Sequence, residues 1–479
     1  MSLCQKRLCL SQRFRLVQLS FLQRDGLPFA EVLPEERIEQ AFAEEDATFA
    51  QDDECVYTPP LTLWAFLSQV LHKEEQRSCL AAVSRVAVLL VALGWNACSK
   101  STGAYCKARA KLPVKVLHRL VTDLAEGCER EVPRQWLWHG RHVKLADGTT
   151  VTMPDTEANR AEYPQQSGQQ EGLGFPIARM VVLFSLATAM LSDMAMGPYS
   201  GKETGETALL REQLERLDPQ DILLTDKLYC SYFTIAMLLL GACDFVARLH
   251  QSRKVDYKKM KRLRAGDCLI TWTRPDKLEW MDQATYEQIP ETLTLRMVEV
   301  QVNEPGFRTE SFLVVTTLLD HKAYPKEEIA DLYRKRWLAE LDIRAIKISL
   351  GMDVLRCKSP EMIRREVWTC LLAYNLIRKT ILQAAHAADL SPRELSFTHA
   401  MQTIAASLGN LPVMDDDTAA RLIESQLTGL SEHIIGKRPN RVEPRAVKRR
   451  PKPHRLLTMP REEARALLMQ GIDPYEKKK

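Results

Sequence analysis

Four polar side chains recur at helical spacing between residues 329 and 350. Tyr333, Arg336, Glu340 and Lys347 fall within about 60° of one another on a helix that turns about 100° per residue. Aliphatic residues beside this stripe form an edge that would face a core. The stripe could place a metal-binding carboxylate next to phosphate-binding bases. It could also be an ordinary solvated face, held by pairs such as Arg336 with Glu340.

Two aspartates end segments with strand-like patterns. Val143, Leu145 and Asp147 share one parity in an alternating stretch, so a strand that buries the two aliphatic residues would present the carboxylate at its end. Asp226 closes an aliphatic run over residues 221–226, which is typical of a strand buried on both faces. The surrounding segments predict a β-β-β-α-β-α-β order and therefore an α+β fold with a mixed sheet flanked by helices.

Three carboxylates that converge from two strands and a helix suit phosphodiester chemistry. Mg²⁺ and Mn²⁺ prefer carboxylate oxygens. Two such ions about 3.5–4 Å apart can activate a water or a 3′-hydroxyl and stabilise the leaving oxygen. Without metal, the three carboxylates would repel one another, so we expect the pKa of at least one of them to be raised.

The same residues resemble the signature of the DDE transposases of bacterial insertion sequences, specifically the insertion-sequence four family. The signature residues around the third acid are Tyr333, Arg336, Trp337, Glu340 and Lys347. The resemblance places the first acid at Asp147, within residues 145–149, and the second at Asp226, within residues 224–229. Lys227 follows the second acid where many relatives have arginine, which keeps the charge but loses a two-pronged phosphate contact.

The resemblance implies an RNase H-like core and a role for each signature residue. Asp147 would bind both of two Mg²⁺ ions (Mn²⁺ is possible), and Asp226 and Glu340 one each. The phosphates of the transposon end would be held by three side chains: Arg336, Lys347 and Tyr333. Trp337 would stack on an unpaired or flipped base, although it could instead be a packing residue.

The activity implied by this resemblance is cut-and-paste DNA transposition, with metal-dependent cleavage at transposon ends and strand transfer into target DNA. The partners would be double-stranded DNA, at the terminal inverted repeats and at the target, and a second copy of the chain in a homodimer. We expect a bacterial cytoplasmic protein that associates with the nucleoid. Two alternatives remain open: a catalytically silent DNA-binding protein derived from a transposase, and an RNase H-like nuclease without strand transfer.

Changes in periodicity divide the chain into five segments. We expect the following: 1–140, an all-helical N-terminal domain for transposon-end binding; 141–249, the first part of the catalytic core; 250–325, a β-rich insertion; 326–435, the rest of the core with C-terminal helices; 436–479, an extended basic, proline-rich tail. The N-terminal domain could contain a DNA-binding helix-turn-helix or be a plain helical bundle. We expect its first 24 residues to be a disordered leader.

The formal net charge of +4 hides a strong segregation of charge. Residues 25–54 hold eleven acids against one base, whereas residues 248–264 hold eight bases against one acid and residues 437–455 nine bases against one acid. The candidate DNA contacts in the two basic segments are Lys258, Lys259, Arg262, Lys448, Arg449 and Arg450. A solvated charge run is the alternative for both. We expect the acidic segment to compete with DNA for basic surfaces.

Cysteine content and hydropathy exclude other classes of protein. Twelve cysteines are scattered without a C-x-x-C pair, which favours reduced thiols in a cytosolic protein over a disulfide framework or a zinc finger. The longest apolar runs are well short of the roughly 20 residues that span a bilayer, so we expect no membrane partner. Hydrophobic residues at 45% and charged residues at 27% are typical of a globular chain.

Overall fold

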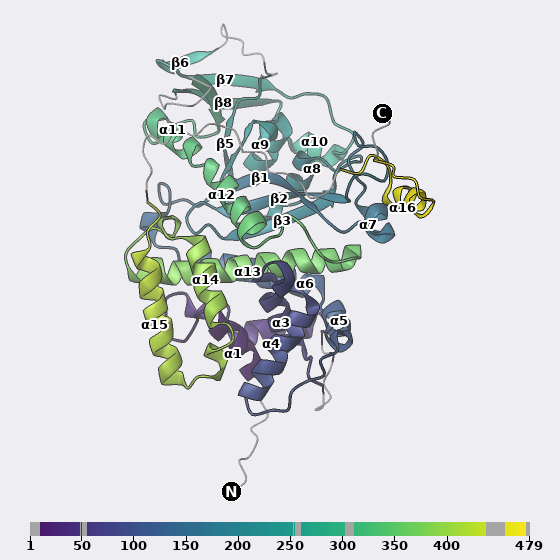
Figure 1. Ribbon diagram of the computed structural model, residues 1–479. Helices are drawn as coiled ribbons and strands as arrows, with labels where there is room; N and C mark the ends of the chain where they lie inside the picture. The colour runs from purple at the N-terminus through teal and green to yellow at the C-terminus, as the bar shows by residue number, and fades with distance from the viewer. Residues whose placement is uncertain are drawn as a thin grey trace.

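One large mixed sheet and many helices make up the fold (Figure 1). The computed structural model describes residues 10–47, 49, 55–251, 253, 260–301, 311–436 and 456–475. Its strands are β1 (Val143–Thr152), β2 (Ile177–Ser185), β3 (Leu191–Pro198), β4 (Ile222–Thr225), β5 (Asp244–Arg248), β6 (Lys261–Arg264), β7 (Asp267–Thr273), β8 (Thr292–Gln301) and β9 (Ser311–Thr316). The mixed α+β class predicted from the sequence is therefore correct.

The sheet has the strand order β3-β2-β1-β4-β5-β9-β8-β7-β6. The β3-β2 and β2-β1 pairs are antiparallel, whereas β1-β4 and β4-β5 are parallel. All remaining pairs, from β5-β9 to β7-β6, are antiparallel. The strands that lie between the second and third acids in the sequence thus extend the central sheet at one edge.

Alternating side chains of the strands enter two separate cores, one on each face of the sheet. Leu145 and Leu224 belong to the first core, while Ala146 and Leu223 belong to the second. The first face is covered by α11 (Lys326–Arg334), α12 (Trp337–Arg344) and α13 (Pro360–Ala387), and the second by α8 (Glu206–Arg211), α9 (Tyr232–Leu240) and α10 (Gln283–Gln288). The helix with the third acid therefore lies on the first face.

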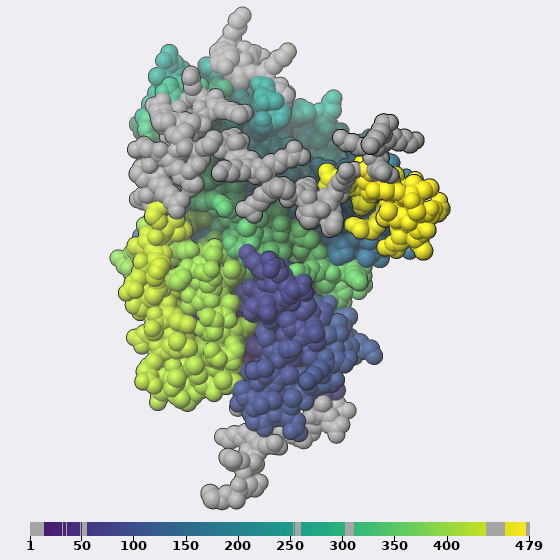
Figure 2. All heavy atoms as spheres, viewed as in Figure 1, coloured from purple at the N-terminus to yellow at the C-terminus, as the bar shows by residue number. Residues whose placement is uncertain are grey.

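Helices from both ends of the chain form one layer around α13, below the sheet in Figures 1 and 2. They are α1 (Leu10–Ser20), α2 (Glu35–Glu44), α3 (Pro59–Val70), α4 (Cys79–Ala92), α5 (Thr102–Lys111), α6 (Val114–Arg130), α14 (Phe397–Ser407) and α15 (Asp416–Glu432). Asn375 of α13 donates to the carbonyls of Val121 in α6 and Leu191 in β3, at 3.1 and 2.9 Å. No helix in the described part of the chain has the length and apolarity needed to cross a bilayer.

Two segments expected to lack structure contain helices. In α1, Phe14 and Val17 are buried, and Trp64 Nε1 donates to Ser20 Oγ at 3.0 Å, so the expected disordered leader is wrong from residue 10 onward. The tail was expected to be extended, but residues 461–469 form α16 (Arg461–Met469). Burial of apolar side chains against distant helices explains the order of α1. Residues 437–455 lie outside the described residues.

Basic side chains of α6 pair with acids of the segment 25–54. Arg119 contacts Glu44, and Lys115 Nζ lies 3.9 Å from Glu45 Oε2. Phe42, between these acids and Arg37, is buried in the first core. The described residues 25–47 of the acidic segment are thus part of the helical layer, and the apolar face of α6 packs against α13 and β3. This arrangement favours the helical-bundle alternative for α6 over a free recognition helix.

Candidate active site

The parallel strands β1, β4 and β5 bring two of the predicted acids to corresponding positions, but the expectation that Asp147 ends its strand is wrong, because β1 continues along β2 to Thr152. One aliphatic residue of each strand pairs in parallel register and faces the first core: Leu145, Leu224 and Val246. Asp147, Asp226 and Arg248 each lie two positions further along, where the side chain returns to the same face. The three residues therefore form a row across the sheet, beneath the face that α11 and α12 cover.

The predicted helix over residues 329–350 is not continuous, and the break lies at the signature arginine. The backbone N–H of Arg336 donates to the Tyr333 carbonyl at 3.0 Å, three residues back, so a tight turn separates α11 from α12. After α12 the chain continues as the π-helix Ala345–Ser349. The side chain of Arg336 reaches Asp147 of β1 from this break.

Arg336 joins the first and third acids. Its Nη2 lies 2.5 Å from Glu340 Oε1, and its Nη1 lies 3.4 Å from Asp147 Oδ2. The guanidinium is 18% exposed, so solvent screens these contacts only partly. The structure thus brings Asp147, Arg336 and Glu340 into direct contact, as the signature spacing requires.

Asp147 has a perturbed pKa. Burial is the largest cause and raises the pKa of Asp147 to about 6, with the charges of Asp226 and Glu340 raising it further. The Arg336 charge and the Gly148 N–H, which donates to Asp147 Oδ1 at 2.8 Å, oppose this rise. The raised pKa expected from converging carboxylates is present, although burial contributes more than repulsion does.

Asp226 is oriented by the turn that follows β4. Its Oδ1 accepts the backbone N–H of Leu228 at 2.8 Å and so caps the 3₁₀ turn Lys227–Tyr229. Lys227 points to Gln251, with Nζ and Oε1 3.5 Å apart. The second oxygen of the Asp226 carboxylate has no hydrogen bond among the contacts of the described residues.

Tyr333 and Lys347 are engaged with the protein itself. Tyr333 is buried against Phe312, with ring centroids 5.3 Å apart, and burial raises the pKa of its hydroxyl to about 12. Lys347 Nζ donates to the Thr150 carbonyl at 2.7 Å and lies 3.3 Å from Thr149 Oγ1. Burial lowers the pKa of Lys347. Both signature residues therefore stabilise the elements around the site through contacts within the protein.

The aromatic and basic candidates differ in how they are placed. Trp337 is 55% exposed at the start of α12, so most of its ring does not pack into the core of the chain. Arg262 lies exposed on β6, at the far edge of the sheet from β3. The other basic candidates lie outside the described residues: Lys258, Lys259, Lys448, Arg449 and Arg450.

Arg248 and Glu206 are neighbours of the site that the sequence analysis missed. Arg248 ends β5 and its charge acts on Tyr333. The sequence signal for Arg248 was a basic residue at the end of a third aliphatic strand. Glu206, at the start of α8, lies behind β1, and Tyr229 Oη donates to its Oε2 at 3.2 Å. A Cβ at Gly148 would come within 2.3 Å of this carboxylate, so a side chain at position 148 would displace the end of the Glu206 side chain.

The three acids have the oxygen donors that a hard divalent cation prefers, but their carboxylates do not lie close enough together to bind one. All three acids supply carboxylate oxygens, and the raised pKa of Asp147 shows a carboxylate with too little compensating positive charge. Among the described residues, however, no three His, Cys, Asp or Glu side chains come close enough together to hold a metal ion. The Arg336 guanidinium lies between Asp147 and Glu340, where a cation would also bind.

Comparisons with known proteins agree with this geometry. Residues 138–376 match the family described as Transposase DDE domain. The chain is 26% identical over 404 residues to the transposase InsG for insertion sequence element IS4 of Escherichia coli (strain K12), covering 82% of this chain and 85% of that protein. It is 23% identical to the probable transposase for insertion sequence element IS5377 of Geobacillus stearothermophilus, covering 61% of this chain and 70% of that one.

A solved structure also aligns with most of the chain. It is the piggyBac transposase synaptic complex with hairpin DNA, at 10% identity and a TM-score of 0.42, covering 89% of this chain and 87% of that one. The match to the DDE domain includes both strand-borne aspartates and the whole signature segment. The chain therefore belongs to the DDE transposases of bacterial insertion sequences, in the insertion-sequence four family.

Proposed function

We propose that the chain is a cut-and-paste DNA transposase that cleaves at the ends of its element and joins them to target DNA. The observation that carries this proposal is the contact of Arg336 with both Asp147 and Glu340, beside the row that Asp147 and Asp226 form. The order β3-β2-β1-β4-β5, with three antiparallel strands followed by two parallel ones, supports an RNase H-like core. The antiparallel strands β9 to β6 would be its insertion.

Asp147, Asp226 and Glu340 would hold two Mg²⁺ ions, or Mn²⁺ in their place. When bound, the ions supply activation of the attacking hydroxyl and stabilisation of the leaving oxygen. The chain prepares this site by burying Asp147 and by orienting Asp226 through the Leu228 N–H. The acids can bind cations only after the Arg336 guanidinium moves away from the oxygens of Asp147 and Glu340. A phosphate of the DNA end would then accept hydrogen bonds from the planar guanidinium.

Around the acids, the remaining signature residues have separate tasks. The exposed ring of Trp337 is free to stack on an unpaired base at the DNA end. Tyr333 and Lys347 keep α11 and the π-helix against the sheet, and each carries a polar tip next to the place where a phosphate would bind. Arg248 adds a positive charge at the end of β5.

DNA would run from this site over the basic surfaces of the chain. Contacts to the phosphate backbone would come from Lys258, Lys259, Arg262, Lys448, Arg449 and Arg450. The helices before residue 140 would bind the terminal repeat. Two copies of the chain would pair the two ends as a homodimer, on nucleoid DNA in the bacterial cytoplasm.

The test is a cleavage and joining assay on a duplex carrying the inverted repeat found beside the coding region, in the presence of Mg²⁺. Replacing Asp147, Asp226 or Glu340 by alanine should abolish nicking and joining while end binding persists. Asp331→Ala is a matched control, because Asp331 is a solvent-exposed acid on α11 that pairs with the neighbouring Arg334.

The assay also separates the two rival functions. End binding by the wild-type chain without any cleavage would support a catalytically silent DNA-binding protein. Cleavage without strand transfer would support a nuclease. Cleavage by an alanine variant would show that the replaced acid is not catalytic.

A further inference from the structure

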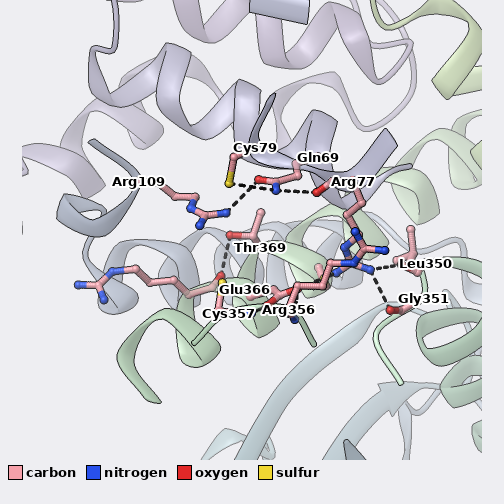
Figure 3. A network of polar contacts seen from close by, with 12 residues as sticks. Gln69, Arg77, Cys79, Arg109, Leu350, Gly351, Arg356, Cys357, Glu366 and Thr369 are labelled. Carbon is pink, nitrogen blue, oxygen red and sulfur yellow. Dashed lines mark hydrogen bonds and ion pairs between the residues drawn. The ribbon is translucent and has the colours of Figure 1, made fainter. Parts of the chain in front are cut away.

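The turn that ends the signature segment is held by an arginine from the N-terminal helices (Figure 3). The π-helix Ala345–Ser349 ends in carbonyls that have no partner further along the helix. Arg77 Nη1 donates to two of the carbonyls that follow, those of Leu350 at 3.0 Å and Gly351 at 2.8 Å. A positive charge at a helix carboxyl end is favourable, so this contact fixes the end of the segment.

Arg77 is itself held rigidly. It is 4% exposed, and its Nη2 lies 3.1 Å from Glu366 Oε1 on α13. The other oxygen of Glu366 accepts the backbone N–H groups of Arg356 and Cys357, each at 2.9 Å. Because both charges of the pair are buried, neither side chain can leave without stranding the other in the core. One guanidinium therefore joins the 3₁₀ helix Glu74–Arg77, the signature segment and α13.

Gly351 is shaped to receive Arg77. Its φ of +68° lies in the left-handed region that side chains disfavour. A Cβ at this position would lie 3.3 Å from Arg77 Nη1, closer than most real Cβ contacts. Glycine therefore permits both the backbone turn and the approach of the guanidinium.

A second cation from the same region supports the turn. Lys73 Nζ donates to the Ile348 carbonyl at 2.8 Å, so the N-terminal helices contact three carbonyls within four residues. Lys73 is exposed, unlike Arg77. Lys73 thus provides a peripheral contact and Arg77 a buried one.

On its other side, the same turn is attached to the strand of the first acid. Lys347 donates to the Thr150 carbonyl of β1, and the Thr152 N–H donates to the Asp353 carbonyl at 3.1 Å. The π-helix is therefore clamped between Arg77 and β1. Any movement of Arg77 relative to the sheet would displace the segment that carries Lys347 and Glu340.

We propose that Arg77 is a positioning residue for the transposition reaction. We call its contacts with the carbonyls of Leu350 and Gly351 the latch. The latch attaches the end of the signature segment to the N-terminal helices and so keeps Glu340 and Lys347 in place relative to Asp147. This inference rests on the proposed function and adds a role for a residue that touches neither DNA nor metal. Displacement of a catalytic group by about 1 Å can cost about 100-fold in rate, so a modest loosening of the latch is measurable.

Arg77→Lys tests the latch in the full-length chain. Lysine keeps the charge but ends in a single nitrogen, and so loses the planar fork in which Nη1 of Arg77 contacts the two carbonyls and Nη2 contacts Glu366. We expect single-turnover cleavage of the end duplex to fall about 10-fold or more, with the Kd for that duplex unchanged within about 2-fold. Amide hydrogen exchange over residues 345–355 should quicken about 10-fold, while α9 on the opposite face of the sheet keeps its protection.

Arg85→Lys is the matched control. The Arg85 guanidinium donates to Ser68 Oγ and the Gln76 carbonyl, both within the N-terminal helices, at 3.2 and 3.0 Å. This variant should change neither cleavage nor exchange over residues 345–355. Lys73→Ala should give a smaller acceleration of exchange than Arg77→Lys.

Each outcome bears on a separate claim. Unchanged exchange over residues 345–355 in Arg77→Lys would overturn the latch, and faster exchange with normal cleavage would overturn its role in positioning. If Arg77→Lys does not fold, Gly351→Ala tests the same contact from the other partner with the same expectations. Absence of cleavage by the wild-type chain would count against the proposed function, whereas the exchange experiment would still decide whether the latch exists.

Discussion

Two buried carboxylates near β1 differ in how fully they are compensated. Glu129, on α6, accepts hydrogen bonds from Thr188 Oγ1 at 2.8 Å and His142 Nδ1 at 2.8 Å, and its Oε2 lies 3.1 Å from Lys144 Nζ. Burial alone would raise the pKa of Glu129, but the Lys144 charge and the hydrogen bond from His142 lower it well below its usual range. Asp147, three residues beyond Lys144, has a raised pKa instead.

The difference lies in the partners and not in the burial. Glu129 has the Lys144 ammonium at 3.1 Å and a hydrogen bond from His142 as well. Asp147 shares one arginine with Glu340 and also experiences the charge of Asp226. A buried acid with a full set of partners stabilises the fold, whereas one with an excess of negative neighbours is prepared for a cation. This contrast predicts opposite consequences for the same kind of substitution.

The largest expected effect is on catalysis. Asp147→Asn keeps the shape of the side chain but removes the charge that would bind metal, so we expect cleavage to fall at least about 1000-fold, or about 4 kcal/mol of transition-state stabilisation. Glu129→Gln should cleave at the wild-type rate per folded molecule. A single-turnover assay on the end duplex measures both, and a comparable loss in Glu129→Gln would remove the contrast.

The second largest expected effect is a loss of stability when Glu129 is replaced. Glu129→Gln leaves Lys144, which is 8% exposed at its side chain, without its charged partner. Removing one member of a buried pair costs about 3–5 kcal/mol, so we expect a loss of this order in the free energy of unfolding. Urea denaturation followed by circular dichroism measures it. A loss below about 1 kcal/mol would mean that Lys144 finds other partners.

How much of this could be predicted from the sequence depends on how local each signal is. Strands such as β1 and β4 follow from alternation and aliphatic runs within a few residues, and the sequence predicted Asp226 directly after its strand but wrongly ended β1 at Asp147. Arg248 carries the same kind of signal on β5 and was missed because it was counted only as part of a charge run. The type of these elements could thus be predicted from the sequence.

Features that depend on distant partners were not predictable. The break before α12 accompanies the contact of Arg336 with Asp147, which is 189 residues away. The order of α1 depends on contacts with α3 and α13, such as the hydrogen bond of Thr380 Oγ1 to the Phe21 carbonyl. Helical periodicity still predicted that Tyr333, Arg336 and Glu340 share the side of the segment that faces the sheet. The tight turn between α11 and α12 does not move any of the three to the opposite side.

The pKa of Asp147 predicts a smaller effect on stability with the opposite sign. Since the folded chain raises this pKa from 3.8 to about 6, it binds the proton more tightly than the unfolded chain, and stability falls as pH rises through this range. Asparagine does not ionise. Without metal at pH 7.5, Asp147→Asn should therefore be more stable than wild type by about 1–2 kcal/mol, after the loss of one Arg336 contact.

Denaturation in a chelating buffer at pH 4 and pH 7.5 measures this gain. The difference between Asp147→Asn and wild type should shrink toward zero at pH 4, where the aspartate is mostly protonated in the fold. Added Mg²⁺ should stabilise the wild-type chain and not the variant. A variant that is less stable than wild type at pH 7.5 would show that Arg336 compensates Asp147 fully.

The smallest effect belongs to His142, at the edge of the Glu129 network. The hydrogen bond to Glu129 raises the pKa of His142, so the charged imidazolium stabilises the fold at low pH and this contribution is lost as pH rises through the folded pKa. His142→Asn should therefore be less stable than wild type at pH 6, and the difference should narrow by pH 9. We expect about 1 kcal/mol or less, because the His142 side chain is 31% exposed. If the difference stays constant between pH 6 and pH 9, the imidazole acts as a neutral hydrogen-bond donor, and the charge that lowers the pKa of Glu129 is that of Lys144 and not that of His142.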